Sequence, residues 1–187
     1  KTGEGTLTLS GMNNFTGETI ISQGTLALEN QGRLQSSSLV TVNGTLDISA
    51  ASSAALKALT GSGRIILGDA GLRIDGGINV FSGIISGNGG LSIMGGTQTF
   101  TGENTFLGAT SVGANSQLRI GDGGTTGSIT GNIGNYGSVV FNRSNSLTYG
   151  GVITGPGTLG VMGGGTLVVT GDSSFNGGTI IQDSTLQ

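Results

Sequence analysis

One stretch of sequence occurs three times in this chain, and that repetition limits the folds available to it. The stretch GMNNFTGETIISQGTLAL at residues 11–28 returns as GENTFLGATSVGANSQLRI from residue 102 and as GDSSFNGGTIIQDSTLQ from residue 171. Phe15, Phe106 and Phe175 correspond, and the match extends backwards to give copies at residues 3–28, 94–120 and 163–187. Self-similarity of this kind is typical of solenoids and repeat arrays.

The spacing of the copies suggests the size of the repeating turn. Phe15 and Phe106 are 91 residues apart and Phe106 and Phe175 are 69 apart, both close to multiples of about 23. Within each copy apolar residues alternate, as at Leu7 and Leu9, which predicts short strands separated by Gly, Asn and Ser turns. Three short strands and three turns fill roughly 20 to 25 residues, the size of one coil of a parallel β-helix.

We therefore expect an all-β protein in which residues 1–187 form a single right-handed parallel β-helix of three-stranded coils. With roughly 23 residues in each coil, the chain makes about eight coils, which stack to about 40 Å. Inward Leu, Ile, Val and Phe should form continuous ladders, and the Phe of each copy should lie at one recurring corner. A β-sandwich is the alternative, but it gives no reason for the spacing of the copies.

Residues 51–61, ASSAALKALTG, are the one place where the sequence is compatible with a short helix. Ala54, Leu56 and Leu59 suit a helical turn that Gly61 would end. A surface loop that leads into a strand at residues 64–67 is slightly favoured over the helix.

Composition excludes several classes of protein. The chain has 40 Gly and one Pro, yet 34% of its residues are hydrophobic, which argues against a disordered chain, and Gly does not recur at every third position as in collagen. The formal net charge is -3 and the seven basic residues are scattered, so no nucleic-acid footprint is visible. The chain contains no Cys and no His, which removes the commonest metal ligands and the commonest general base.

The pattern G-x-G-T-L-x-L-x-G-x-x-x-F-T-G-x-T-x-I-x-x-G-T-L-x-L at residues 3–28 resembles the autotransporter-associated β-strand repeat. That repeat occurs in passenger domains of type V secreted proteins of Gram-negative bacteria. Stretches such as VTVNGTLDIS and YGGVITGPGTL look similar, so the resemblance covers nearly the whole chain. The second copy departs from the pattern, with Gln98 where Leu is usual and one extra residue before Leu118, which leaves the packing of that coil open.

The resemblance implies a protein at the bacterial cell surface or outside the cell, with an outer-membrane translocator barrel at the C-terminus of the full-length protein. Because the sequence starts and stops inside a repeat, we interpret it as a piece of a longer passenger domain. The leading functional hypothesis is a passenger stalk that acts in adhesion to host cells or bacteria, with a host receptor, matrix protein or glycan as partner. A released passenger that acts as a receptor ligand or toxin comes second, and a carbohydrate-active enzyme third; self-association stays open.

No residue is assigned to catalysis, to a cofactor or to a metal, and we expect no enzyme. The best cluster of ionisable residues is Asp69 and Asp75 with Arg64 and Arg73, which is interpreted as a solvated strand edge and turn. The stretch GDGGTTGS at residues 121–128 is interpreted as a flexible Gly turn, since a single copy lacks the repetition that builds calcium sites in β-solenoids.

Three further positions are candidates for contact or packing. Tyr136 and Arg143 are candidates for an exposed contact surface, although a plain loop is favoured. Tyr149 matches Phe81 in the sequence and should lie inward or at a corner. Residues 30–79 depart most from the repeat, and insertions on one face of a solenoid are where binding usually occurs.

Overall fold

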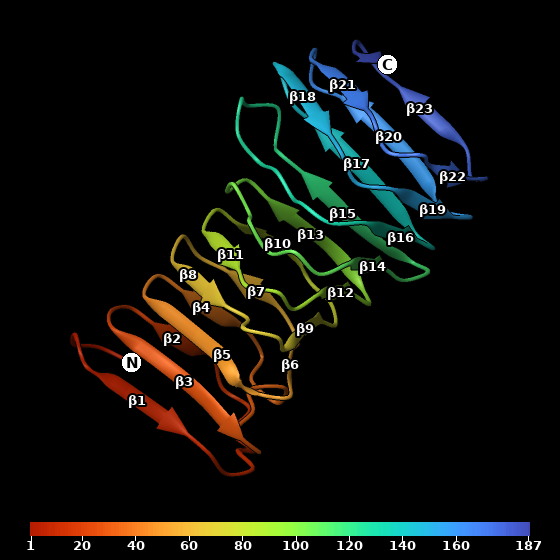
Figure 1. Ribbon diagram of the computed structural model, residues 1–187. Helices are drawn as coiled ribbons and strands as arrows, with labels where there is room; N and C mark the ends of the chain where they lie inside the picture. The colour runs from red at the N-terminus through yellow and green to blue at the C-terminus, as the bar shows by residue number, and fades with distance from the viewer.

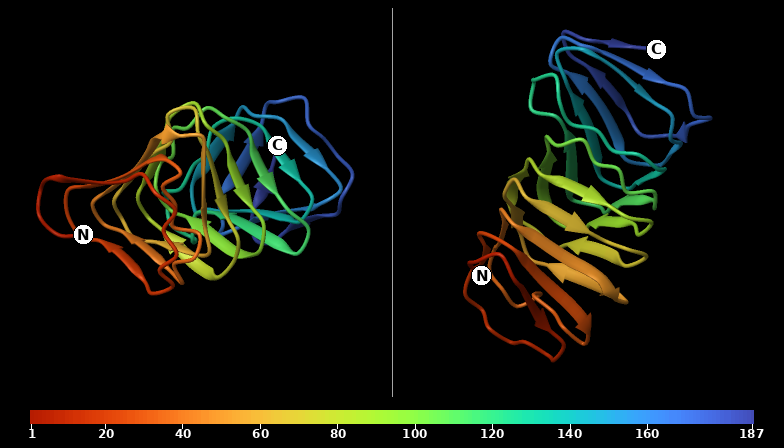
Figure 2. Two further views of the ribbon diagram at one scale, coloured as in Figure 1. Left: turned by 90° about the horizontal axis from the view of Figure 1, so that it is seen from below. Right: turned by 60° about the vertical axis from the view of Figure 1, so that its left-hand side comes forward.

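The computed structural model describes all of residues 1–187 and contains strands without any helix (Figure 1). Every strand pair is parallel. The strands stack in turns, and the two termini lie at opposite ends of the stack (Figure 2). The all-β parallel β-helix predicted from the sequence is confirmed. With no helix present, none could cross a membrane.

The strands form five sheets that run along the stack. The five-stranded sheet comprises β1 (Thr6–Leu9), β3 (Thr25–Asn30), β5 (Thr45–Ala51), β8 (Arg64–Ile66) and β11 (Ile84–Ser86). The six-stranded sheet comprises β10 (Ile78–Phe81), β13 (Gly96–Phe100), β15 (Ser116–Ile120), β17 (Ser138–Asn142), β20 (Thr158–Met162) and β23 (Thr179–Ile181).

The remaining strands form one long sheet and two short ones. The seven-stranded sheet comprises β6 (Ser53–Leu56), β9 (Gly71–Ile74), β12 (Leu91–Ile93), β14 (Thr110–Val112), β16 (Ile133–Asn135), β19 (Ile153–Gly155) and β22 (Ser174–Phe175). One three-stranded sheet comprises β2 (Thr19–Ile21), β4 (Val40–Val42) and β7 (Leu59–Thr60), and the other comprises β18 (Ser146–Tyr149), β21 (Thr166–Val169) and β24 (Thr185–Leu186).

One turn of the stack is shorter than the sequence spacing suggested. Hydrogen bonds between neighbouring turns mostly join residues that are 19, 20 or 21 positions apart, and those that join Glu103 and Asn104 to residues 121–132 span 24 or 25 positions. The chain therefore makes about nine turns. The prediction of roughly 23 residues per coil, and of eight coils, is therefore wrong. Its error was to assume that the three copies stand on one face, whereas 91 and 69 are not multiples of a turn of this length.

Each copy of the repeat wraps once around the stack, so its last strand pairs with its first. In the first copy β1 pairs with β3, in the second β13 pairs with β15, and in the third β21 pairs with β24. These three pairs belong to three different sheets. The two G-T strands of one repeat therefore lie one above the other. The second repeat faces a different direction from the first, because β13 and β15 belong to the sheet of β10, whereas β1 and β3 belong to the sheet of β11.

The aromatic residue of the repeat does not occupy one recurring environment. Phe106 is fully buried, Phe175 is half-buried in β22, and Phe15 is 44% exposed in the first turn, which has a neighbouring turn on one side only. The prediction of a single recurring corner for these rings is wrong, because the second copy is rotated relative to the first. A different pair of rings does stack: Phe81 and Phe100 are register partners with ring centroids 6.4 Å apart, edge to face.

The core is a set of aliphatic ladders, as the alternation of apolar residues predicts. Leu26 pairs with Leu46, Leu46 with Ile65, and Ile65 with Ile85, each in the next turn of the five-stranded sheet. These side chains belong to one continuous cluster of 34 buried residues. Burying each such side chain contributes about 1.5–3 kcal/mol, so the core stabilises the stack along its whole length.

A column of glycines runs along the corner that precedes the five-stranded sheet. A Cβ built on any member would lie within 2.6 Å of a carbonyl oxygen in the preceding turn, which is closer than real Cβ atoms come. Only glycine lets neighbouring backbones approach so closely, which explains why glycine precedes the strand at positions such as Gly24 and Gly44. The glycine column consists of Gly24, Gly44, Gly63, Gly83 and Gly102.

Residues 51–61 form neither a helix nor a loop. They contain β6 and β7, and in β6 Ala54 and Leu56 point inward as register partners of Leu72 and Ile74. Both readings of this segment are therefore wrong. Stacking on the next turn overrides the helical propensity of alanine, because the strand completes a ladder that a helix would interrupt.

Gln98 occupies an inward position of β13 and is 1% exposed. Its Nε2 donates to Asn79 O at 3.4 Å and to Thr99 O at 3.3 Å, while its Oε1 has no partner. The departure from the usual Leu therefore costs stability but keeps the strand in register with β10 and β15.

Candidate functional surface

The four ionisable residues singled out from the sequence do not converge on one site. Arg73 Nε forms an ion pair with Asp75 Oδ1, whereas Asp69 accepts a hydrogen bond from Asn88 Nδ2 at 2.9 Å. Arg64 lies on β8 in the five-stranded sheet, and Arg73 lies on β9 in the seven-stranded sheet. The structure also holds no group of three or more acidic residues that could ligate a metal ion.

The longest connection in the stack is residues 121–132, between β15 and β16. It contains GDGGTTGS, and Gly121, Gly123 and Gly127 have φ values of 84°, 98° and 101°. Side chains with a Cβ rarely adopt this left-handed region, so glycine lets the loop turn sharply here.

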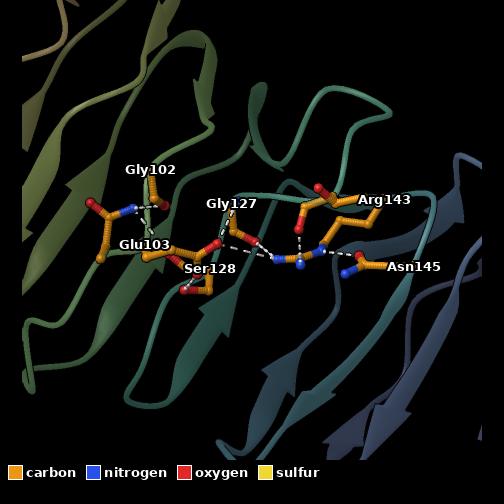
Figure 3. A network of polar contacts seen from close by, with 8 residues as sticks. Gly102, Glu103, Gly127, Ser128, Arg143 and Asn145 are labelled. Carbon is orange, nitrogen blue, oxygen red and sulfur yellow. Dashed lines mark hydrogen bonds and ion pairs between the residues drawn. The ribbon is translucent and has the colours of Figure 1, made fainter.

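Arg143 holds this loop from one side through hydrogen bonds to its backbone (Figure 3). Its Nη1 donates to Gly127 O, its Nη2 donates to Thr125 O, and its Nε donates to Asn145 Oδ1 at 3.0 Å. The residue is only 8% exposed. A buried guanidinium is tolerated when its N–H groups are satisfied, and here three of its nitrogens have acceptors.

Glu103 holds the same loop from the other side (Figure 3). Its carboxylate accepts from Gly127 N at 3.2 Å and from Ser128 Oγ, and its Oε1 lies 3.8 Å from Arg143 Nη1. Next to it, the buried Asn104 accepts from Ile85 N at 2.9 Å and donates to Ser128 O at 3.0 Å. Residues 121–128 are therefore fixed by hydrogen bonds, which differs from the flexible turn predicted from the sequence.

Replacing Arg143 by methionine should loosen this loop and lower the free energy of unfolding by about 2 kcal/mol, because the buried carbonyl of Gly127 and the part-buried carbonyl of Thr125 lose charged donors. Limited proteolysis with mass mapping should then show faster cleavage within residues 121–132. The control is Arg64→Met, which removes an exposed arginine from β8 and should change stability by less than about 0.5 kcal/mol. Equal cleavage of the wild type and Arg143→Met would contradict the role of Arg143.

Tyr136 and Arg143 do not form a joint exposed surface. Tyr136 is 60% exposed just after β16, but Arg143 is buried under the loop. The proposed pairing of the two is therefore wrong, and Tyr136 alone is available for contact. Leu107 is a second exposed apolar side chain near the loop, with 67% of it exposed. It belongs to the preceding turn, and its carbonyl oxygen lies close to Gly131.

Tyr149 is buried, as its match to Phe81 predicts. It is 3% exposed, its ring centroid lies 5.5 Å from that of Phe141, and its hydroxyl donates to Gly131 O at 2.6 Å. Desolvation by burial raises the pKa of the Tyr149 phenol well above its ordinary value. The side chain stays neutral and anchors the end of the 121–132 loop.

Residues 30–79 form regular turns rather than an insertion. Strands β4 to β10 follow one another through this region, and its longest unpaired run is residues 31–39. A polar groove of about 550 Å³ passes along the glycine column, and half of its lining residues lie within residues 30–79. The groove is lined by Glu4, Gly24, Thr25, Asn43, Gly44, Thr45, Ser62, Gly63, Arg64, Ser82, Gly83 and Ile84.

Comparison with known proteins identifies the repeats. The model of the passenger-associated-transport-repeat family matches residues 1–28, 95–114 and 162–187. The chain is 45% identical over 162 residues to the adhesin BmaC autotransporter of Brucella suis biovar 1 (strain 1330), an alignment that covers 85% of this chain but only 5% of that protein. No solved structure matches. The three matched repeats and this similarity together support an autotransporter passenger that carries passenger-associated-transport-repeats.

Proposed function

We propose that this chain is part of a passenger stalk, exposed on the bacterial cell surface, that acts in adhesion to host cells or to other bacteria. The observation that carries the proposal is the 45% identity, over 85% of this chain, to a protein named as an autotransporter adhesin. The partners of the full-length protein are a host receptor, matrix protein or glycan, and its own translocator barrel.

The architecture suits a stalk. The continuous core and the parallel hydrogen bonds between turns make a rod that extends about 43 Å over about nine turns spaced 4.8 Å apart. Because each turn contacts only its neighbours, a rod of this kind can be lengthened by adding turns without redesigning the core. A stalk holds a contact surface away from the cell without needing catalytic groups.

The contact surface that we propose is the 121–132 loop with Tyr136. The loop is the longest departure from the stack and is held in one conformation by Arg143 and Glu103. A fixed loop loses less conformational entropy on binding than a mobile one. Tyr136 is exposed, and tyrosine is among the residues that contribute most to protein interfaces. No catalytic role is proposed for Asp69 or Asp75.

The test is binding of the purified, fluorescently labelled chain to cultured epithelial cells and to bacteria, with a cell-response readout in the same wells. We expect saturable binding that Tyr136→Ala weakens about tenfold, the effect of losing a moderate hot spot. Binding should be unchanged by Ile78→Ala, a control at another exposed apolar side chain, on β10. It should also survive Asp69→Asn and Asp75→Asn.

Other outcomes separate the alternatives. Absence of saturable binding would contradict an adhesive role for this segment. A cell response at low concentration would favour a receptor ligand. Release of a carbohydrate product that Asp69→Asn or Asp75→Asn abolishes would identify an enzyme.

A further inference from the structure

The sequence contains three Asn-Gly pairs, and the structure places them in turns that look alike but are bonded differently. The pairs are Asn43-Gly44, Asn88-Gly89 and Asn176-Gly177. All three asparagines are exposed to solvent. Exposure of the side chain therefore does not distinguish them, and the difference lies in the backbone N–H of the following glycine.

Two of the pairs are held by the preceding turn through both of their backbone amides. Asn43 N and Gly44 N both donate to Ile21 O at 2.8 Å. In the same way, Asn88 N and Gly89 N donate to Gly68 O at 2.6 and 2.9 Å.

The side chains of these two asparagines are also bonded. Asn43 Oδ1 accepts from Ser62 N at 3.3 Å, and Asn88 Nδ2 donates to Asp69 Oδ1 at 2.9 Å. In both pairs the glycine nitrogen and the asparagine amide are therefore restrained, and either would have to break a hydrogen bond before the two could react together.

The third pair keeps only part of this arrangement. Asn176 N donates to Gly155 O at 3.1 Å, but the N–H of Gly177 has no hydrogen-bond partner. The Asn176 side chain has no partner either, and it lies in the connection between β22 and β23. The missing bond would run to the turn before it, as it does in the other two pairs, and that turn is present in the structure.

We propose that Asn176 is a site of spontaneous modification, where the chain deamidates through attack by its own backbone. The nitrogen of Gly177, after loss of its proton to hydroxide or another base, attacks Cγ of Asn176. A C–N bond forms, the Cγ–Nδ2 bond breaks, and the departing nitrogen takes up a proton and leaves as ammonia. Water then opens the cyclic imide at either carbonyl and gives aspartate or isoaspartate, with no change of oxidation state.

The modification changes the surface of the third repeat. One neutral amide becomes a carboxylate, so the formal net charge changes from the -3 of the unmodified chain by one further negative charge. The isoaspartate product also adds one carbon to the backbone that leads into β23, which disturbs the hydrogen bond from residue 176 to Gly155 O.

Peptide mapping of the folded protein during incubation in mildly alkaline buffer tests the proposal, because each deamidation adds about 1 Da to its peptide. We expect Asn176 to react at least tenfold faster than Asn43 and Asn88, roughly the effect of one hydrogen bond that must open at each of the other two sites. In concentrated urea, where inter-turn hydrogen bonds are lost, the three sites should react at similar rates.

The Asn176→Gln variant is the matched control, since its longer side chain would close a larger and slower ring; its peptide should keep its mass. Equal rates at the three sites in the folded protein would overturn the proposal. So would a preference for Asn176 that persists unchanged in urea, because the cause would then be the local sequence rather than the free N–H of Gly177.

Discussion

The Gly83→Ala substitution is expected to lower the free energy of unfolding by about 3 kcal/mol, from the addition of a single methyl group. A Cβ at this position would lie 1.9 Å from Gly63 O in the preceding turn and 2.5 Å from Phe81 Cζ. Neither atom can move aside freely, because the oxygen belongs to the backbone of the stack and Phe81 is fully buried. The turns on both sides must therefore separate to accommodate it.

The matched control is Gly71→Ala, in β9, where an added Cβ has no atom within 4 Å and the backbone has no positive φ. Here the substitution should leave stability unchanged or raise it by about 0.4–1 kcal/mol, because alanine reduces the freedom of the unfolded chain. Urea unfolding followed by far-UV circular dichroism measures both. Equal midpoints for the two variants would show that the turns are not packed through the glycine column.

The Phe106→Ala substitution is expected to cost about 3–5 kcal/mol, whereas Phe15→Ala at the equivalent position of the first repeat should cost less than about 1 kcal/mol. Phe106 is fully buried in the core cluster, and Phe15 is 44% exposed. Truncation therefore leaves a cavity at Phe106 and only a shallower surface at Phe15.

Thermal unfolding of the two variants under identical conditions checks this difference. Both substitutions remove the same atoms from the same position of the repeat, so any difference in melting temperature reports the local environment. Similar losses of stability at the two positions would contradict the burial of Phe106 and the exposure of Phe15 in the first turn.

The stacked-strand fold was predictable because short sequence patterns indicate it, and the same patterns recur in many turns. Alternation at Leu26 and Leu46 predicts inward positions whichever turn they belong to, and the glycines that precede strands of the five-stranded sheet mark one corner. The number of residues per turn was not predictable from the spacing of Phe15, Phe106 and Phe175, because repeated sequence does not require repeated orientation. The prediction for the Ala-rich segment at residues 51–61 failed because its strand β6 depends on partners in the next turn, Leu72 and Ile74.

The hydrogen bonds that fix the 121–132 loop could not have been predicted from the sequence of the loop. Arg143 follows β17 in FNRSN, where a lone arginine usually points into water, and its acceptors at Thr125 and Gly127 lie 18 and 16 residues upstream in a segment without periodicity. Tyr149 was placed correctly because its aligned aromatic in the repeat, Phe81, is also buried, although the two side chains lie in different sheets. A side chain was predictable where the repeat supplied a template and not where the loop interrupted it.

The direction of the hydrogen bonds has a mechanical consequence. Strands lie across the stack and their hydrogen bonds run along it, so a force that pulls the two ends apart acts on the bonds of one turn at a time. Most turns release 19 to 21 residues when they open, which extend by roughly 60–75 Å. A rod built in this way lengthens in steps under load and keeps its remaining turns intact, which would let the proposed stalk absorb tension before the chain is fully extended.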